Sequence, residues 1–287
     1  MGQVSNLANE ATNKAGRAAG TAGRAVSNHS DKLEWLAKAG WFAKGALYVT
    51  LGTLAIMAAV GEGGGLSGSK GVLQWVAGQP FGKVLLVAAV IGFSCYALWR
   101  FAQAIVDPER HDDKKSEVFK RLGWAASGIL HGSLAVAAFQ MFQGQSGGSS
   151  KQTWLAKAMS AGTWGVVLVG LLGAGAIAAG LYQFKKAAKL GFMDDVNTSA
   201  MSRNEIKALK VVGRAGHAAR GVTFPIIGYF LIMAAVNHNA SQAKGMGGAL
   251  SELAKTSWIA LAVIAVGLTA YGVLQFFYTR YRHINMT

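Results

Sequence analysis

Six long apolar stretches constrain this chain more than any other feature of its sequence. Each has about 20 residues, the length that a helix needs to cross the hydrocarbon core of a bilayer. Only 14% of the residues are charged, against about a quarter in soluble domains. Because backbone groups in hydrocarbon must be satisfied within the chain, we predict an all-α integral membrane protein with six transmembrane helices. The stretches cover residues 41–60, 84–106, 124–142, 164–184, 217–236 and 258–278.

A ten-residue pattern occurs three times, once in each even-numbered stretch. It reads GFSCYALWRF from Gly92, GAIAAGLYQF from Gly175 and GLTAYGVLQF from Gly267. The odd-numbered stretches begin with three related motifs, AGWFAKG, LGWAASG and AGHAARG. The repeated unit is therefore a helical hairpin, present in three successive copies. Because two spans restore the original direction, we expect three parallel hairpins with pseudo-three-fold symmetry about the membrane normal.

The 28 Lys and Arg residues are unevenly distributed. The terminal segments and the linkers between hairpins hold 22 of them, and the loops inside the hairpins hold 6. Since cytoplasmic loops carry an excess of Lys and Arg, we expect both termini in the cytoplasm. The same asymmetry accounts for the net charge of +15 without nucleic acid. It favours the lipid bilayer, with anionic headgroups at the cytoplasmic face, as a partner, and other membrane proteins are further candidates.

The loops inside the hairpins place apolar residues three or four apart. Residues 71–82, 153–165 and 247–258 each predict a short interfacial helix in a periplasmic loop. The first 34 residues repeat AGRA and contain few large apolar side chains. They fit either a disordered or partly helical tail or a helix on the membrane surface. The expected parts are a low-complexity cytoplasmic tail and three membrane hairpin repeats, over residues 1–34, 35–110, 111–195 and 196–287.

The sequence offers no pattern typical of an active site or a metal site. Its one cysteine, Cys95, excludes an intrachain disulfide, and the Cys/His spacing of zinc sites is absent. No catalytic acid pair, Ser-His-Asp set or HExxH motif occurs. We therefore expect no enzymatic activity, no catalytic, metal-binding or cofactor-binding residues, and no cofactor.

Glycines recur at fixed places in the apolar stretches. Gly45 and Gly52 are seven apart and share one helix face. Small residues on one face let membrane helices approach closely. We expect a role in helix packing for Gly45, Gly52, Gly92, Gly128, Gly175, Gly221, Gly228 and Gly267.

His131 is the one ionisable residue well inside a predicted span. Ionisable residues at that depth are candidates for function. The simpler alternative is a neutral histidine bonded to a neighbouring carbonyl or to Gln140. The corresponding residues of the other copies, Tyr48 and Phe224, favour that alternative.

Three basic residues, Lys44, Arg100 and Arg220, lie near the cytoplasmic ends of predicted spans. Lys44 and Arg220 occupy the same repeat position. Long basic side chains at such places extend to lipid phosphates. The sharper hypothesis is a shared anion-binding ring, which Ser127 and Gln183 of the second copy weaken.

The repeat motifs resemble a known family. The third copy carries GRAGHAARG, GGALSEL, GLTAYG and YTRYRHI, and the first keeps GWFAKG and YALWR. These motifs, over about residues 35–284, resemble the bacterial membrane-protein family called domain of unknown function 1206, which has three tandem two-helix repeats. The second copy departs most, with Ala179 where the others have an aromatic residue. The family carries no established activity, so the resemblance transfers no catalytic residue.

Two classes of function remain open. The first is a structural or accessory component of the bacterial inner membrane, multi-pass and without enzymatic activity. The alternative is a small channel or transporter that uses the pseudo-symmetric centre, with His131 as its polar site. Ion transport usually leaves acidic or polar residues at mid-depth, and only His131 qualifies, so the first class is favoured.

Overall fold

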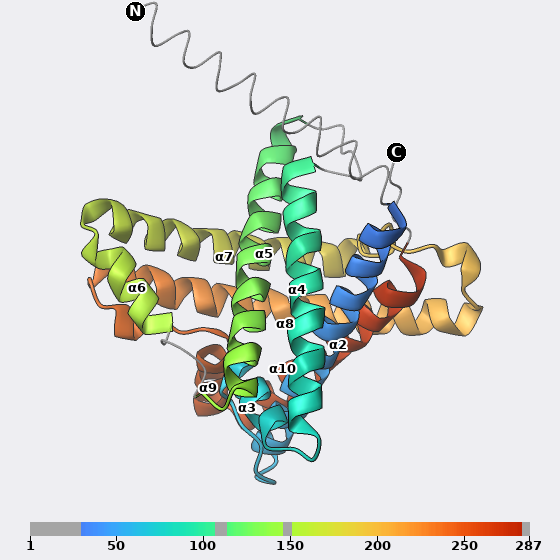
Figure 1. Ribbon diagram of the computed structural model, residues 1–287, viewed down its shortest axis with the longest axis horizontal. Coiled ribbons are helices and arrows are strands. Elements are labelled where there is room, and N and C mark those ends of the chain that lie inside the picture. The colour runs from blue at the N-terminus through green and yellow to red at the C-terminus, as the bar shows by residue number, and fades with distance from the viewer. Residues whose placement is uncertain (1–29, 107–113, 146–150, 283–287) are drawn as a thin grey trace, which may run out of the picture.

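The computed structural model describes residues 30–106, 114–145 and 151–282 (Figure 1). This part consists of helices and their connections and has no strand, which confirms the all-α prediction. The predicted tail lies almost entirely outside it. The long helices are α2 (Ser30–Ala59), α4 (Gly82–Val106), α5 (Lys114–Phe142), α7 (Thr163–Lys189), α8 (Arg203–Val236) and α10 (Trp258–Tyr281). The short ones are α3 (Gly68–Ala77), α6 (Lys151–Ser160), α9 (Met246–Thr256) and the 3-10 turns η1 (Thr198–Ala200) and η2 (Ala240–Gln242).

All six long helices are apolar enough and long enough to cross a bilayer. No more than half of the residues in the most apolar part of each are buried against the rest of the chain. Large side chains such as Leu122, Leu171 and Val263 stay exposed. An apolar surface of this extent is suited to lipid contact. The prediction of a multi-pass membrane protein with six spans is therefore confirmed.

α2, α5 and α8 begin 10 to 14 residues earlier than the apolar pattern predicts, and α8 differs the most. α8 starts at Arg203 rather than at residue 217. Its first turn is closed by a capping box, in which the Ser202 hydroxyl accepts from the Glu205 amide at 3.3 Å. In return, the Glu205 carboxylate accepts from the Ser202 amide at 2.8 Å. The polar first turns of α8 therefore form a stable extension beyond its apolar part.

The most extensive helix pairs join different repeats. α4 packs along α5, α7 along α8, and α10 along α2, and in Figure 1 the α7–α8 pair runs across the direction of the α4–α5 pair. In each pair a glycine of the first span of one repeat (α2, α5 or α8) faces a phenylalanine of the second span of another repeat (α10, α4 or α7). A methyl group on Gly45 would lie 2.6 Å from the Phe276 ring, so a larger residue would push the helices apart. The matching contacts are Gly128 with Phe101 and Gly221 with Phe184.

The first and third hairpins are closed by glycines of their own. A methyl group on Gly40 would lie 2.6 Å from Tyr96 Cβ, and one on Gly216 would lie 2.6 Å from Tyr271 Cα. These contacts bring α2 against α4 and α8 against α10. The second spans of these hairpins, α4 and α10, also contribute glycines to the contact. Gly92 of α4 faces Ala43, and Gly267 of α10 faces Ala219.

The second hairpin is open. α5 and α7 do not pack along one another, although each packs against a helix of a neighbouring repeat. Gly123 and Gly175, at the repeat positions that close the other hairpins, are exposed and would have no neighbour within 4 Å of an added methyl group. Gly175 thus differs from the expected packing role, because α5 diverges from α7. We call the exposed faces marked by Gly123, Ala126, Gly175 and Ala178 the α5–α7 seam.

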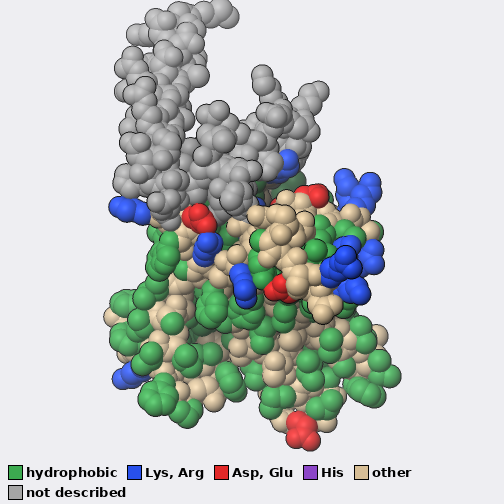
Figure 2. All heavy atoms as spheres, turned by 90° about the vertical axis from the view of Figure 1, so that its right-hand side faces the viewer, with side chains coloured by type: hydrophobic (Ala, Val, Ile, Leu, Met, Phe, Trp, Pro, Cys, Tyr) green, Lys and Arg blue, Asp and Glu red, His purple; other side chains and the backbone are tan. Residues whose placement is uncertain are grey.

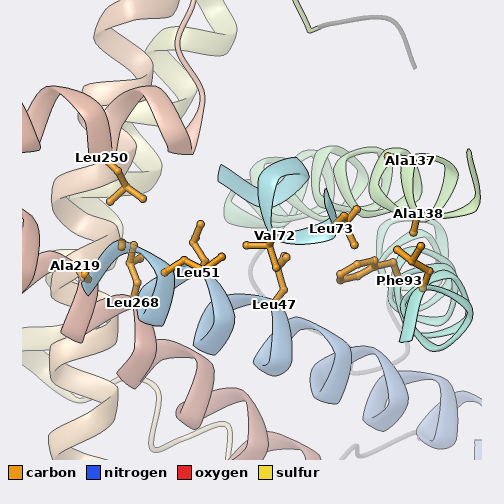
Figure 3. Packing of buried hydrophobic residues seen from close by; sticks show 14 of the residues in the cluster. Leu47, Leu51, Val72, Leu73, Phe93, Ala137, Ala138, Ala219, Leu250 and Leu268 are labelled. Carbon is orange, nitrogen blue, oxygen red and sulfur yellow. The ribbon is translucent and has the colours of Figure 1, made fainter. Parts of the chain in front are cut away.

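Buried apolar side chains form two main clusters along the bundle. The loop-side cluster lies toward the hairpin loops and joins α2, α3, α4, α5, α8, α9 and α10. Its members include Leu51, Phe93, Ala138, Leu250 and Leu268 (Figure 3). The linker-side cluster lies toward the linkers between hairpins. Its members include Trp41, Trp99, Phe192, Leu209 and Tyr278.

Charged side chains collect at the linker end. On the face shown in Figure 2, most Lys and Arg lie in the upper part, and the lower part is largely hydrophobic. The linker after α7 is held at this end of the bundle, because the backbone N–H of Asn197 donates to the backbone carbonyl oxygen of Tyr281 at 2.9 Å. Asp195 pairs with Lys186 at 3.0 Å and Arg282 at 3.9 Å. Burial alone would raise the pKa of Asp195, but these two cations hold it below its usual value.

Candidate anion-binding site

Two tyrosines form the centre of a cluster of three cations, of which Lys44 is buried and Arg100 and Arg220 are partly buried. Tyr96 of α4 is 0% exposed and Tyr271 of α10 is 3% exposed. They occupy the same repeat position, and each sits against the glycine that closes its hairpin. A tyrosine can be buried so deeply when its hydroxyl finds a hydrogen-bond partner. In both cases that partner is a cation from a predicted span.

Lys44 lies between the two tyrosines. Its side chain is on α2 and only 6% exposed. The ammonium donates to the Tyr96 hydroxyl at 2.9 Å, and it lies 5.0 Å from the centroid of the Tyr96 ring and 5.3 Å from that of Tyr271. Cation–π contacts of this kind stabilise a buried charge by about 1–2 kcal/mol. Lys44 is therefore directed into the bundle and does not extend to the membrane surface.

Arg100 approaches Tyr96 from one turn further along α4. Its Nη2 and Nε donate to the Tyr96 hydroxyl at 2.6 and 2.9 Å. Its Nη1 donates to the Gln103 carboxamide oxygen at 2.8 Å. The guanidinium is thereby oriented by one helix and placed next to Lys44.

Arg220 of α8 provides the third cation. Its Nη1 donates to the Tyr271 hydroxyl. Its guanidinium carbon lies 4.4 Å from the ring centroids of both Tyr271 and Phe224. Its Nε is buried and has no hydrogen-bond partner within the described ranges. The three basic residues singled out in the sequence are therefore brought together around two tyrosines.

No carboxylate neutralises these cations in the part of the chain that the structure describes. The ion pairs found there involve other basic residues. Even if both phenols were ionised, three cations would leave one net positive charge. A charge withdrawn from water without an opposite charge is costly, most of all for the buried Lys44. The cluster therefore has the electrostatics of an anion-binding site.

His131 borders the cluster from α5. Its Nδ1 lies 2.8 Å from the Ser127 carbonyl oxygen, which can only accept, so Nδ1 carries the proton. Its ring meets the Tyr96 ring edge-on at 4.4 Å. The charges of Lys44, Arg100 and Arg220 all act on this ring. This is the carbonyl-bonded arrangement weighed for His131, placed beside the cations.

A second histidine borders the cluster from α8. His217 is buried, and its Nδ1 lies 2.6 Å from the Gln183 carboxamide oxygen of α7. Its ring stacks on Phe192 and meets Tyr271 edge-on at 5.6 Å. Gln183 thus links the second repeat to the site. It holds the repeat position that Arg100 holds in the first repeat.

The cations lie where the two apolar clusters meet, and Tyr96 and Tyr271 belong to the linker-side cluster. On α2, Trp41 of the linker-side cluster precedes Lys44, and Leu47 of the loop-side cluster follows it. On α10, Leu268 precedes Tyr271 and belongs to the loop-side cluster. Apolar side chains therefore close the cation layer toward the hairpin loops, whereas the buried Gln103 and Gln275 continue it toward the linkers.

The glycines selected from the sequence lie mostly at helix contacts. Besides those that face phenylalanines or close hairpins, Gly52 faces Thr269 and Gly228 faces the backbone of Gly173. Gly175 lies on the exposed α5–α7 seam. Tyr96 and Tyr271, which hold the cations, were not selected, although their shared repeat position was visible in the motifs CYALW and AYGVL.

Three segments of the chain match the family described as Domain of Unknown Function (DUF1206), over residues 39–107, 122–189 and 215–282. The chain belongs to this family. Each matched segment covers one hairpin, which confirms the resemblance and the three tandem repeats. The chain is also 37% identical over 249 residues to the Uncharacterized protein YxxB of Bacillus subtilis (strain 168), covering 86% of this chain and 90% of the relative. No solved structure matches it.

Proposed function

We propose that this family member is a structural or accessory component of the bacterial inner membrane, without enzymatic activity. The observation that carries the proposal is the apolar filling of the bundle. A channel or carrier needs polar groups along a path through the membrane. In the described residues the buried polar groups lie at the cation layer and on its linker side, and Leu51, Leu268 and their neighbours close the bundle on the loop side. The rest of the surface is suited to lipid and to other membrane proteins.

The architecture that we propose is a pseudo-three-fold ring of hairpins. Its support is the glycine–phenylalanine contact, which recurs between the first and second, second and third, and third and first repeats. The last of these returns from the end of the chain to its beginning, as a closed ring requires. The open second hairpin departs from this equivalence and gives the ring a seam.

We propose cytoplasmic termini for this ring. The excess of Lys and Arg in the linkers supports this orientation, as does their collection at one end in Figure 2. Cysteine substitutions in intact bacterial cells provide the test. Ser67 and Ser241 in the hairpin loops should react with an impermeant thiol reagent, and Ser199 in the linker should not. The reverse labelling would overturn the orientation.

Flux measurements distinguish the structural role from transport. Purified protein in liposomes should give no flux of protons, potassium, chloride or small anions above that of protein-free vesicles. The channel or transporter alternative requires a flux that His131→Phe abolishes while the fold is retained. Such a flux would overturn the proposal. Under a structural role, His131→Phe should change stability by about 1–3 kcal/mol at most.

A further inference from the structure

The excess positive charge of the cation layer requires a compensating anion at the layer itself. Lys44, Arg100 and Arg220 repel one another at low dielectric. The loop-side cluster closes the bundle on one side of the layer, so the anion cannot lie further in that direction. Unused donors point to the same need. Among the described residues, Arg220 Nε and Gln275 Nε2 are buried without a hydrogen-bond partner, and Gln275 holds the repeat position of Arg100.

The second repeat departs from the others at this layer. Ser127 stands where the other copies have Lys44 and Arg220, and Ala179 stands where they have a tyrosine. Both replacements are much smaller than the residues they correspond to. They lie on α5 and α7, the two helices of the open hairpin. One third of the cation layer is therefore bordered by small side chains rather than by a tyrosine and a cation.

The α5–α7 seam lies at that third of the layer. His131 on α5 contacts Tyr96, and Gln183 on α7 contacts His217, so both helices of the seam reach the site. The exposed side chains further along the seam are apolar, with Leu130 on α5 and Leu171 on α7. Because these helices span the membrane, the seam faces lipid rather than water. A molecule that occupies it needs an apolar body and an anionic group.

We infer that the site binds the phosphate group of an anionic phospholipid, whose acyl chains lie in the α5–α7 seam. Arginine matches phosphate oxygens with parallel N–H donors, and lysine adds a point charge. Lys44, Arg100 and Arg220 neutralise the phosphate, and the tyrosine hydroxyls orient these cations. The seam supplies the lateral path from the bilayer. This inference goes beyond the structural role proposed above, which flux measurements test independently of lipid headgroups.

The test compares lipids with the full-length protein, washed free of lipid in a neutral detergent. Phosphatidylglycerol, phosphatidylcholine and inorganic phosphate are added separately, and the midpoint of thermal unfolding is measured. At a lipid concentration about 100-fold above the dissociation constant, phosphatidylglycerol should raise the midpoint by about 5 °C. Phosphatidylcholine and inorganic phosphate should leave it unchanged. An equal rise with inorganic phosphate would identify a free anion as the ligand, and an equal rise with phosphatidylcholine would exclude charge recognition; either overturns the inference.

Variants locate the effect. Lys44→Gln should abolish the rise, whereas Lys185→Gln, an exposed cation on α7, should keep it. Because Lys44→Gln also removes a buried hydrogen bond, Ala179→Tyr provides a second variant that retains all three cations. It supplies the tyrosine of the other copies and should block the lipid, so the rise should disappear. A full rise in Ala179→Tyr, or no rise with phosphatidylglycerol in the unmodified protein, overturns the inference.

Discussion

Replacing Gly52 with alanine tests the close approach of α2 and α10, which joins the first and third repeats. A β-carbon at residue 52 would lie 2.7 Å from both the Ala265 carbonyl oxygen and the Thr269 backbone nitrogen. It would lie closer still to the Thr269 hydroxyl. Backbone atoms cannot rotate away as a side chain can. The two helices must therefore separate to accommodate even one methyl group.

The magnitude of the effect combines three contributions. Overpacking of a tight contact costs about 1–3 kcal/mol. The Thr269 hydroxyl, which donates to the Ala265 carbonyl at 3.0 Å, loses a hydrogen bond with a net contribution of about 1 kcal/mol. Alanine has a better helix propensity than glycine by about 1 kcal/mol. The net destabilisation of Gly52→Ala is about 2 kcal/mol, which lowers the unfolding midpoint by about 3 °C in a chain of this length.

Thermal unfolding in detergent measures this change, and Gly123→Ala provides the matched control. It is the same substitution in another membrane helix, at a glycine with no neighbour within 4 Å. Gly123→Ala should be neutral or stabilise the protein by up to about 1 kcal/mol. If Gly52→Ala unfolds at the same temperature as Gly123→Ala or above it, the reasoning about the α2–α10 contact is refuted.

Two further predictions concern polar contacts. Tyr96→Phe removes the hydroxyl that accepts from two cations and should destabilise the protein by about 1–3 kcal/mol. Tyr182→Phe on the exposed surface should be neutral, and equal stability of the two variants would contradict the role of Tyr96. Burial alone would raise the pKa of Asp195, but Lys186 and Arg282 lower it. Its carboxylate therefore stabilises the fold above the unfolded pKa of about 3.9, and this contribution is lost as the pH falls through the lower folded value. In unfolding measured from pH 7 to pH 2, Asp195→Asn should flatten that decline, and an unchanged decline would show that the pairing contributes nothing.

The six spans and their grouping into hairpins could be predicted because they depend on local patterns. Apolar length alone identifies a span, and recurring motifs identify a repeat whatever its surroundings. The start of α8 was missed because hydropathy does not register a polar first turn. The Ser202–Glu205 pattern, serine followed three residues later by glutamate, is visible in the sequence and would have moved the start to Arg203.

The open second hairpin could not be predicted from the repeat. Gly123 and Gly175 match the glycines that close the other hairpins, so sequence similarity assigns them the same contacts. Whether those contacts form depends on the residues around them. Ala179, which stands where the other copies have a tyrosine, was noted only as a divergence within the family. In the closed hairpins that tyrosine contacts a glycine of the partner helix, Gly40 of α2 or Gly216 of α8.

The placement of Lys44 could not be predicted from the sequence of its own helix alone. A lysine near the end of a span usually extends to the membrane surface. Here its partner is Tyr96, 52 positions away on another helix. The anion-binding hypothesis was available from the shared positions of Lys44 and Arg220. The tyrosines that hold these cations became apparent only when the helices were placed side by side.

The pairing of α2 with α10 has a consequence for the order of assembly in the cell. α2 is the first described span to be synthesised, and its glycine face is covered by the last one. Ribosomes add about 5–20 residues per second, so roughly 10–40 s separate the end of α2 from the end of α10. During that time Gly45 and Gly52 face lipid or a transient partner. The protein can therefore reach its final arrangement only after synthesis is complete, and a chain truncated before α10 leaves its first span without its principal neighbour.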